Sequence, residues 1–217
     1  MPMSQNLQAA KALIFRITHV QNVPWILENG LHCANGVCDP GFVPIGDGQI
    51  IARRRAVQVP VQPYGDLSDY VPFYFTPFSP MMLNIRTGYR GVIRRSNEEI
   101  AILVSSLHRV SACGAEFVFT DRHALAAAAM ARFSSDLADL EEYVPWPLLQ
   151  ARDFQRDPEW PEKVERYQAE ALVHRHLPAE ALLGIICYTD NVAAILRRSV
   201  ADCGLETQIH VKQGWYF

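Results

Sequence analysis

The chain has 217 residues, of which 49% are hydrophobic and 20% are charged, and its formal net charge is -3 at pH 7. This length fits one domain with a sizeable core. The small negative charge excludes a generally basic nucleic-acid-binding protein, so any contact with nucleic acid requires a local basic patch. No apolar run reaches the length of a transmembrane helix, and we therefore expect no membrane association.

The N-terminus and the cysteines indicate a cytoplasmic protein. The first residues, Met-Pro-Met-Ser-Gln-Asn-Leu-Gln, lack the basic start and the apolar centre of a signal peptide. The five cysteines are odd in number and irregular in spacing, which argues against a disulfide framework and fits a reducing compartment. Cys33 and Cys38 are close together, but no second pair follows at the spacing of a zinc site. We therefore predict no bound metal ion.

The N-terminal part of the chain combines regular elements with a long loop. Residues 12–18 are rich in branched side chains and predict a strand. Asn22 is placed to cap a short helix, with Pro24 in its first turn and Gly30 at its end. Glycines and prolines crowd residues 33–48 and predict a long loop, a kind of segment that is often functional.

Three consecutive arginines, Arg53, Arg54 and Arg55, follow this loop in a short predicted helix. Neighbouring residues of a helix point about 100 degrees apart, so at most one or two of the three face inward. A solvated surface is the ordinary explanation for such a run. The alternative is one inward arginine beside the glycine-rich loop, which would be a candidate for binding an anion or a base.

Residues 70–75 form an apolar, aromatic run that predicts a buried strand. Pro72 lies inside it and donates no backbone hydrogen bond, so we expect it at a strand start, a bulge or the edge of a sheet. Pro77 and Pro80 end this strand and force a rigid turn. A core strand is the simpler explanation of the run, and an aromatic wall for a flat ligand ring is the alternative.

Residues 85–95 are the densest basic stretch, with four arginines and Tyr89. Arginines that contact phosphates, together with a ring on which a base stacks, are what binding of single-stranded nucleic acid requires. A solvated hairpin is the alternative.

The second half mixes strands and helices without strict alternation, which predicts an α+β domain. Strands are expected at residues 99–105, 116–120, 184–188 and 208–211, and helices at residues 122–132, 160–167 and 190–203. Asp121 and Asp190 are placed to cap two of these helices, and residues 168–178 fit either a helix or a strand. Residues 133–158 are acidic and contain prolines, so we expect an excursion outside the core, whereas the tail at residues 215–217 is apolar and is expected to dock.

Five stretches, taken together and in order, resemble the DarT family of toxins, which ADP-ribosylate DNA. The resemblance covers nearly the whole chain. The stretches are Phe15-Arg-Ile-Thr-His-Val-Gln-Asn-Val-Pro-Trp-Ile-Leu-Glu-Asn-Gly-Leu, Arg53-Arg54, Asp69-Tyr-Val-Pro-Phe-Tyr-Phe-Thr-Pro-Phe-Ser-Pro-Met, Phe119-Thr-Asp-Arg-His123 and Arg166-Tyr-Gln-Ala-Glu170-Ala-Leu-Val.

The resemblance implies a single ADP-ribosyltransferase domain over residues 1–217, with the fold of the poly(ADP-ribose) polymerases and a mixed central β-sheet. It implies NAD as co-substrate and transfer of ADP-ribose to a base, typically thymine, of single-stranded DNA in a short sequence context. It also implies a toxin that blocks DNA replication and a cognate antitoxin like DarG, whose macrodomain removes the modification.

The resemblance also assigns the candidate site residues. The catalytic glutamate of the family falls on Glu170, its arginine on Arg54 by distance from Val59-Pro60, with Arg53 and Arg55 as alternatives, and its histidine on His123. The NAD-contacting start of the family falls on Ile17, Thr18 and His19. Residues 38–54 correspond to the segment that covers NAD, and residues 124–157 to the substrate-recognition loop.

The chemistry of the reaction fits these residue types. Cleavage of the bond between nicotinamide and ribose develops positive charge on the sugar, which a carboxylate such as Glu170 can stabilise. A surface glutamate is the alternative role for Glu170. Arginine is effectively always protonated, so we assign Arg54 to stabilising the anion that develops on the base and leave the proton acceptor open.

Aromatic and basic side chains are candidates for the remaining contacts. Tyr74, with Tyr70 and Phe73, is a candidate wall for the nicotinamide or the target base. Arg94, Arg95 and Tyr89 are candidates for binding DNA. Two rival functions share these features: an ADP-ribosyltransferase with another acceptor (guanine in DNA, RNA or protein), and a catalytically inactive module that binds single-stranded DNA.

Overall fold

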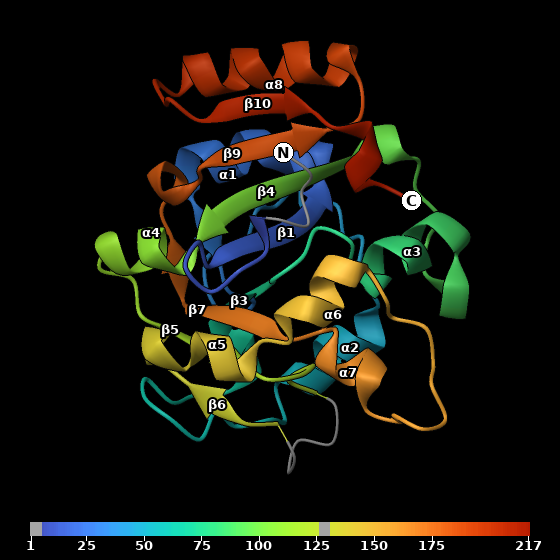
Figure 1. Ribbon diagram of the computed structural model, residues 1–217. Coiled ribbons are helices and arrows are strands. Elements are labelled where there is room, and N and C mark those ends of the chain that lie inside the picture. The colour runs from blue at the N-terminus through green and yellow to red at the C-terminus, as the bar shows by residue number, and fades with distance from the viewer. Residues whose placement is uncertain (1–5, 126–130) are drawn as a thin grey trace.

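A mixed eight-stranded sheet in the order β10-β9-β4-β1-β3-β7-β5-β6 forms the centre of the molecule (Figure 1). The computed structural model describes residues 6–125 and 131–217. The strands are β1 (Leu13–His19), β2 (Leu31–His32), β3 (Tyr70–Tyr74), β4 (Ile100–Ser106), β5 (Phe117–Thr120), β6 (Phe133–Ser134), β7 (Glu170–His174), β8 (His176–Leu177), β9 (Gly184–Cys187) and β10 (Gln208–Val211). The helices are α1 (Val23–Asn29), α2 (Gly48–Arg54), α3 (Pro80–Thr87), α4 (Leu107–Ala112), α5 (Leu140–Tyr143), α6 (Trp146–Ala151), α7 (Lys163–Arg166) and α8 (Asp190–Asp202).

Neighbouring strands of the large sheet are antiparallel except for β9 and β10, which run parallel and are connected by α8. Figure 1 shows α8 beside β10 at one end of the sheet, and α5 and α6 in front of its other half. Helices and strands thus do not alternate regularly, and the predicted α+β class with a mixed sheet is confirmed. No helix among the described residues is long and apolar enough to cross a membrane.

The strands β1 and β3 separate from each other inside the sheet. β1 pairs with β4 along its whole length, from Leu13 to His19, whereas β1 and β3 are in register only at Phe15 and Tyr74. The expectation that Pro72 lies at a strand start, a bulge or the edge of the sheet is therefore wrong, because Pro72 is the third residue of β3, pairs in regular register with Leu172 of β7, and β3 lies between β1 and β7. Pro72 is tolerated because the strands have parted here, and its carbonyl accepts a hydrogen bond from the side chain of Arg16 instead.

The segment from residue 133 to 158 contributes to the core, and its prediction as an excursion outside the core is wrong. Leu140, Trp146 and Leu149, from α5 and α6, are almost fully buried in the main hydrophobic cluster. The indole Nε1 of Trp146 donates to the carbonyl of Leu140, which satisfies its one donor. The acidic residues of this segment lie in α5 and in the stretches around the two helices, whereas α6 has none, and the apolar residues of both helices decide their packing.

A helix is predicted at residues 122–132, but residues 122–125 and 131–132 are not helical. The rest of this range lies outside the described residues. Asp121 does not cap a helix but contacts three arginines. α8 is capped by Thr189 and not by Asp190. Residues 168–174 resolve into strand β7 from Glu170 onward.

The apolar C-terminal tail docks as predicted. The ring of Trp215 meets Phe15 edge-on at 5.8 Å between centroids. The hydroxyl of Tyr216 lies 3.0 Å from the carbonyl oxygens of Ile100 and Ile186. These contacts hold the tail across β4 and β9. All five cysteines are free.

Candidate active site

A cleft opens where β1 and β3 separate, and it consists of two adjoining cavities of about 190 and 220 Å³. Residues 33–47 and helix α2 cover it. The side chains of alternate residues in a strand face opposite ways, so one face of β1 and β3 supplies the floor while the other joins the core. Both cavities are lined by Arg16, Thr18, Phe42, Ile51, Arg54 and Pro72.

Arg54 and Glu170 form a buried ion pair at the floor of this cleft. Nη1 of Arg54 lies 2.9 Å from Oε2 of Glu170. Arg53 and Arg55 are exposed, so Arg54 is the inward member of the arginine run. Nε of Arg54 donates to the carbonyl of Leu67 at 3.4 Å, but Nη2 is buried without a hydrogen-bond partner in the described part of the chain. A buried donor without a partner is costly, so this atom is suited to bind an acceptor group of a ligand.

Backbone groups fix Glu170 at the first position of β7. Its N–H donates to Oγ1 of Thr120 at 3.0 Å, and its Oε1 accepts from the N–H of Ala124 at 2.9 Å. Burial by itself raises the pKa of Glu170, but Arg54, His123 and the N–H of Ala124 outweigh burial and hold this pKa below its usual range. Glu170 is therefore an ionised carboxylate in a water-poor site, where its charge acts strongly on a nearby cation.

His123 and Tyr74 lie beside this carboxylate and line the same cavity. Nε2 of His123 is 3.9 Å from Oε1 of Glu170, and its Nδ1 accepts from the N–H of Leu125. In the neutral form, the proton of His123 therefore resides on Nε2, which faces the carboxylate. Tyr74 is paired with Glu170 across β3 and β7, and burial raises its pKa above the usual range of a phenol.

Arg16 is a residue of the cleft that the sequence analysis missed. Its Nη1 donates to the carbonyl of Pro72 at 2.8 Å. Burial, and then the neighbouring charge of Arg54, lower the pKa of Arg16 to about 10. No carboxylate in residues 6–125 or 131–217 lies within ion-pair distance of it. The available signal was one arginine in the middle of an otherwise apolar strand.

Of the three residues that the family assigns to NAD contact, Ile17, Thr18 and His19, only the first two lie in the cleft. Ile17 and Thr18 line the cleft. The ring of His19 accepts from the N–H of Gln21 through Nδ1, and its Nε2 lies 3.6 Å from Glu99, so it does not line either cavity.

Asn22 connects β1 to the segment that covers the cleft. It stands at the start of α1 but makes no capping hydrogen bond. Its side-chain amide instead accepts from the N–H of Val43 at 2.8 Å and donates to the carbonyl of Val43 at 2.9 Å. It also donates to Thr18 Oγ1 at 3.1 Å. The long loop is therefore held in place over the cleft at Val43.

The aromatic residues of β3 divide between the two faces of the sheet. Tyr70 and Tyr74 face the cleft, whereas Phe73 belongs to the main hydrophobic core. Phe73 therefore does not wall the cavity, because its position in the strand has the opposite parity.

The basic residues predicted to bind DNA follow α3 and flank Val92, which lines the cavity of Glu170. Tyr89 is about half exposed. Nε of Arg94 donates to the carbonyl of Arg86, and Arg95 forms an ion pair with Glu99 at 3.1 Å. None of the three lines either cavity, and the side chains of Arg94 and Arg95 are partly occupied by local contacts. Within the described ranges, no three His, Cys, Asp or Glu residues gather as a metal ion would require.

Comparison with known proteins gives consistent matches over nearly the whole chain. A family model described as "ssDNA thymidine ADP-ribosyltransferase, DarT" matches residues 15–217. A DNA ADP-ribosyl transferase of Escherichia coli O127:H6 (strain E2348/69 / EPEC) is 49% identical over 215 residues, which cover 99% of this chain and 97% of that relative.

Two solved structures from Thermus sp. 2.9 have a similar fold. DarT in complex with ADP-ribosylated ssDNA superposes with a TM-score of 0.86 at 32% identity, and the match covers 96% of this chain and 97% of that chain. DarT in complex with NAD+ superposes with a TM-score of 0.79 at 32% identity, and that match covers 95% and 98% of the two chains.

Proposed function

The chain belongs to the DarT family of DNA ADP-ribosyltransferases, and from this premise we propose that it modifies thymine in single-stranded DNA through the cleft around Glu170. As a member of this family it is an NAD-dependent DNA ADP-ribosyltransferase, with NAD as its co-substrate. The expected ADP-ribosyltransferase fold is confirmed by the similarity to the Thermus structures.

The observation that carries the proposed site is the buried pair of Arg54 and Glu170, in which Nη2 of Arg54 has no hydrogen-bond partner among residues 6–125 and 131–217. Arg54 lines both cavities and Glu170 lines one of them, and binding alone would not require a buried carboxylate there. NAD fits the cleft chemically, because Arg16 and the free donor of Arg54 offer two cationic groups to an anionic diphosphate or to a carbonyl oxygen. Thr18, which lines both cavities, adds a hydroxyl.

In the reaction, NAD supplies a ribose carbon whose bond to nicotinamide breaks as a base nitrogen bonds to that carbon. Neutral nicotinamide leaves, and the base loses one proton. Glu170 stabilises the positive charge that develops on the ribose, and a preorganised charge of this kind contributes roughly 10²-fold or more in rate. Arg54 stabilises the negative charge that develops on the base oxygen next to the reacting nitrogen.

The ionised Glu170 is also the best-placed acceptor for the proton of the base. His123 presents a protonated Nε2 to the site in its neutral tautomer and is therefore a donor there, not a base. Its role is to orient Glu170 and to maintain the ionised state of the carboxylate. Asp47, the other carboxylate that lines this cavity, is engaged in capping α2.

We assign the DNA contacts to residues 124–157, the substrate-recognition loop implied by the family, together with Tyr89, Arg94 and Arg95. The position of Val92 in the cavity wall supports this assignment for the basic residues. An unpaired base exposes its reacting edge at little cost, which favours a single-stranded substrate. Modification of thymine would block replication, and a DarG-like antitoxin is the expected partner.

Incubation with NAD and short single-stranded oligonucleotides, each lacking one base, tests the proposal by mass spectrometry. We expect a mass gain of one ADP-ribose that requires thymine in the oligonucleotide and Glu170 in the protein, so Glu170→Ala should abolish it. A gain that instead requires guanine would reassign the base. Release of nicotinamide without modification of any oligonucleotide would overturn DNA as the acceptor.

A further inference from the structure

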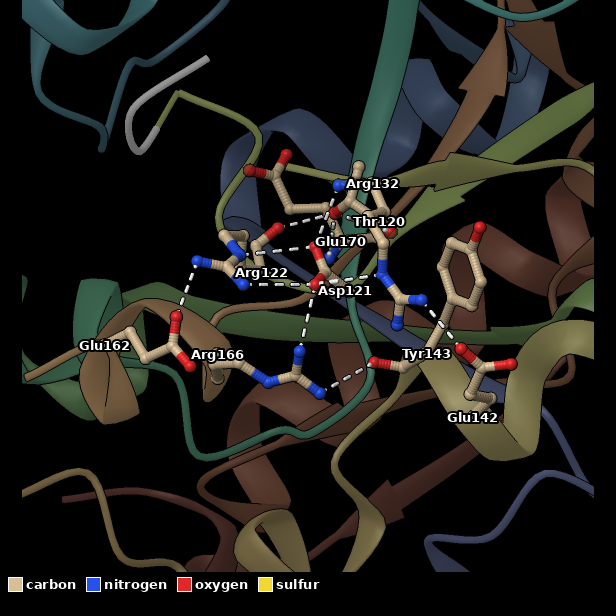
Figure 2. Close-up of polar contacts among 9 residues, drawn as sticks. All are labelled: Thr120, Asp121, Arg122, Arg132, Glu142, Tyr143, Glu162, Arg166 and Glu170. Carbon is tan, nitrogen blue, oxygen red and sulfur yellow. Dashed lines mark hydrogen bonds and ion pairs between the residues drawn. The ribbon is translucent and has the colours of Figure 1, made fainter. Parts of the chain in front are cut away.

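Asp121 is a buried carboxylate on which three arginines converge, and Figure 2 shows this arrangement. Oδ2 of Asp121 lies 2.9 Å from Nη1 of Arg166 and 3.3 Å from Nη2 of Arg122. Nε of Arg132 lies 3.5 Å from the same oxygen. Arg122 follows β5, Arg132 precedes β6 and Arg166 ends α7, and none of the three lines the cleft. We call Asp121, Arg122, Arg132 and Arg166 the Asp121 cluster.

The other oxygen of Asp121 accepts from Nε of Arg122 at 3.3 Å and also binds the backbone. Its Oδ1 accepts from the N–H of Arg132 at 3.0 Å, and the N–H of Asp121 donates to the carbonyl of Arg132 at 3.3 Å. Arg122 and Arg132 lie at the two ends of the segment that begins after β5 and returns at β6. One carboxylate therefore fixes both ends of that segment and, through Arg166, attaches them to α7.

The Asp121 cluster is connected to the reacting carboxylate through the backbone. Oγ1 of Thr120 accepts from the N–H of Glu170 and donates to the carbonyl of Arg122 at 2.6 Å. Two residues further on, the N–H of Ala124 donates to Oε1 of Glu170. The position of Ala124 thus depends on the same turn, residues 120–124, that Asp121 anchors.

We propose that Asp121 is a positioning residue for the DNA half of the reaction: by holding Arg122 and Arg132 to α7, it sets the turn at residues 120–124 against Glu170. The proposal rests on the proposed function, because it concerns the segment adjacent to the transferred base. Asp121 itself touches neither of the cavities assigned to NAD. A change at Asp121 is therefore expected to alter the binding of DNA and to leave the binding of NAD unchanged.

The outer carboxylates do not replace Asp121. Glu162 accepts from Arg122, and Glu142 accepts from Arg132, each from the exposed side of the cluster. Each reaches only one arginine, whereas Asp121 reaches all three and the backbone as well. Glu162 therefore offers a matched control, in which one arginine loses a carboxylate while the central contacts remain.

The test compares Asp121→Asn with Glu162→Gln and the wild-type protein. In Asp121→Asn, an amide N–H group replaces Oδ2 and faces the donors of Arg122 and Arg166, while the remaining Oδ1 still accepts from the backbone of Arg132. For each protein one would measure the Kd of a non-reactive NAD analogue, KM and kcat for a thymine-containing oligonucleotide, the Tm, and the hydrogen exchange of backbone amides.

We expect Asp121→Asn to raise KM for the oligonucleotide at least 10-fold with the Kd of the NAD analogue unchanged within 2-fold. The amides of Ala124 and Arg132 should exchange faster, while those of α8 keep the wild-type rate. Glu162→Gln should behave as the wild type. If Asp121→Asn does not fold, Arg166→Gln provides the second variant, with the same separation of DNA and NAD parameters expected.

Two results would overturn the proposal. One is an unchanged KM for the oligonucleotide in Asp121→Asn. The other is a parallel loss of NAD affinity, DNA affinity and Tm, which would make Asp121 only a stabilising residue. Failure of the wild-type protein to modify DNA would instead refute the proposed function, and the exchange rates of Ala124 and Arg132 would still report whether Asp121 fixes the segment.

Discussion

At the scale of single residues, the ionised state of Glu170 in its buried site depends on the neighbouring guanidinium of Arg54. The pKa of Glu170 in the folded protein lies below its ordinary value. The ion pair therefore stabilises the fold at pH values above the usual pKa range of a carboxyl group, and this stabilisation is lost as the pH falls through the lower pKa of the folded state. Removal of one partner from a buried ion pair costs about 3–5 kcal/mol, because the other charge stays buried without compensation.

Arg54→Gln should therefore move the acid limb of the kcat profile to higher pH. Without the guanidinium, burial dominates and raises the pKa of Glu170, so that the carboxylate is protonated at pH values where the wild type is ionised. The pH dependence of kcat for a thymine oligonucleotide measures this shift. Arg53→Gln is the matched control, because that neighbour is exposed. An unshifted acid limb in Arg54→Gln would contradict the role of Glu170 as the titrating group.

Arg16 provides a second test of the cleft at this scale. Its guanidinium has no carboxylate partner among the described residues and lines both cavities. We expect Arg16→Met to raise the Kd for NAD about 10-fold, which corresponds to roughly 1.4 kcal/mol of lost charge-assisted binding. Titration calorimetry with NAD measures the effect, and Arg55→Met, at an exposed position, is the control. Equal NAD affinity in both variants would exclude Arg16 from the binding site.

At the scale of elements, the cleft exists because β1 and β3 part and a long loop covers the opening. Asn22 holds this loop through both hydrogen bonds of Val43. Asn22→Ala should weaken NAD binding several-fold and speed hydrogen exchange at the amide of Val43, because that amide loses its acceptor. Asn29→Ala removes an exposed amide that bonds only within α1, so it should change neither quantity. Slow exchange at Val43 in Asn22→Ala would contradict this role.

The turn after α3 is the second element whose role can be tested. Arg94→Ala with Arg95→Ala should weaken modification of DNA and leave NAD binding intact, and it should reduce the dependence of DNA affinity on salt. Because Arg95 is paired with Glu99, we expect the larger effect from Arg94 when the two changes are separated. Equal loss of NAD and DNA binding would contradict the assignment of these residues to DNA.

At the scale of the whole molecule, we expect residues 1–217 to unfold as one unit, because one hydrophobic cluster includes residues from β1 through β10. Trp146 connects the segment of α5 and α6 to this cluster and meets Phe75 edge-on. Trp146→Ala should lower the free energy of unfolding by about 3–5 kcal/mol while the transition remains single. Calorimetry measures both, with the more exposed Trp160→Ala as control. Two separate transitions would indicate a second folding unit.

Much of the fold could be predicted from the sequence because the strands are local patterns of branched and aromatic residues. β1, β3, β4, β5, β9, β10 and the long helix α8 all lie within a residue or two of their predicted positions. The helix predicted after Asp121 and the excursion predicted at residues 133–158 were wrong for a shared reason. Asp121 bonds with residues distant in sequence, and a few buried apolar residues of α5 and α6 outweigh their acidic surroundings.

The sequence by itself determined the chemistry available to this protein: the family, the carboxylate Glu170, the run of three arginines and the histidine that follows β5. These follow from residue types and their order. Only the tertiary structure decided that Arg54 is the inward arginine, that Arg16 joins it, that His19 turns toward Glu99, and that Asp121 gathers three arginines. The physical reason is that the direction and burial of a side chain are set by pairing and packing between segments that are far apart in the chain. Local sequence patterns contain no information on these contacts.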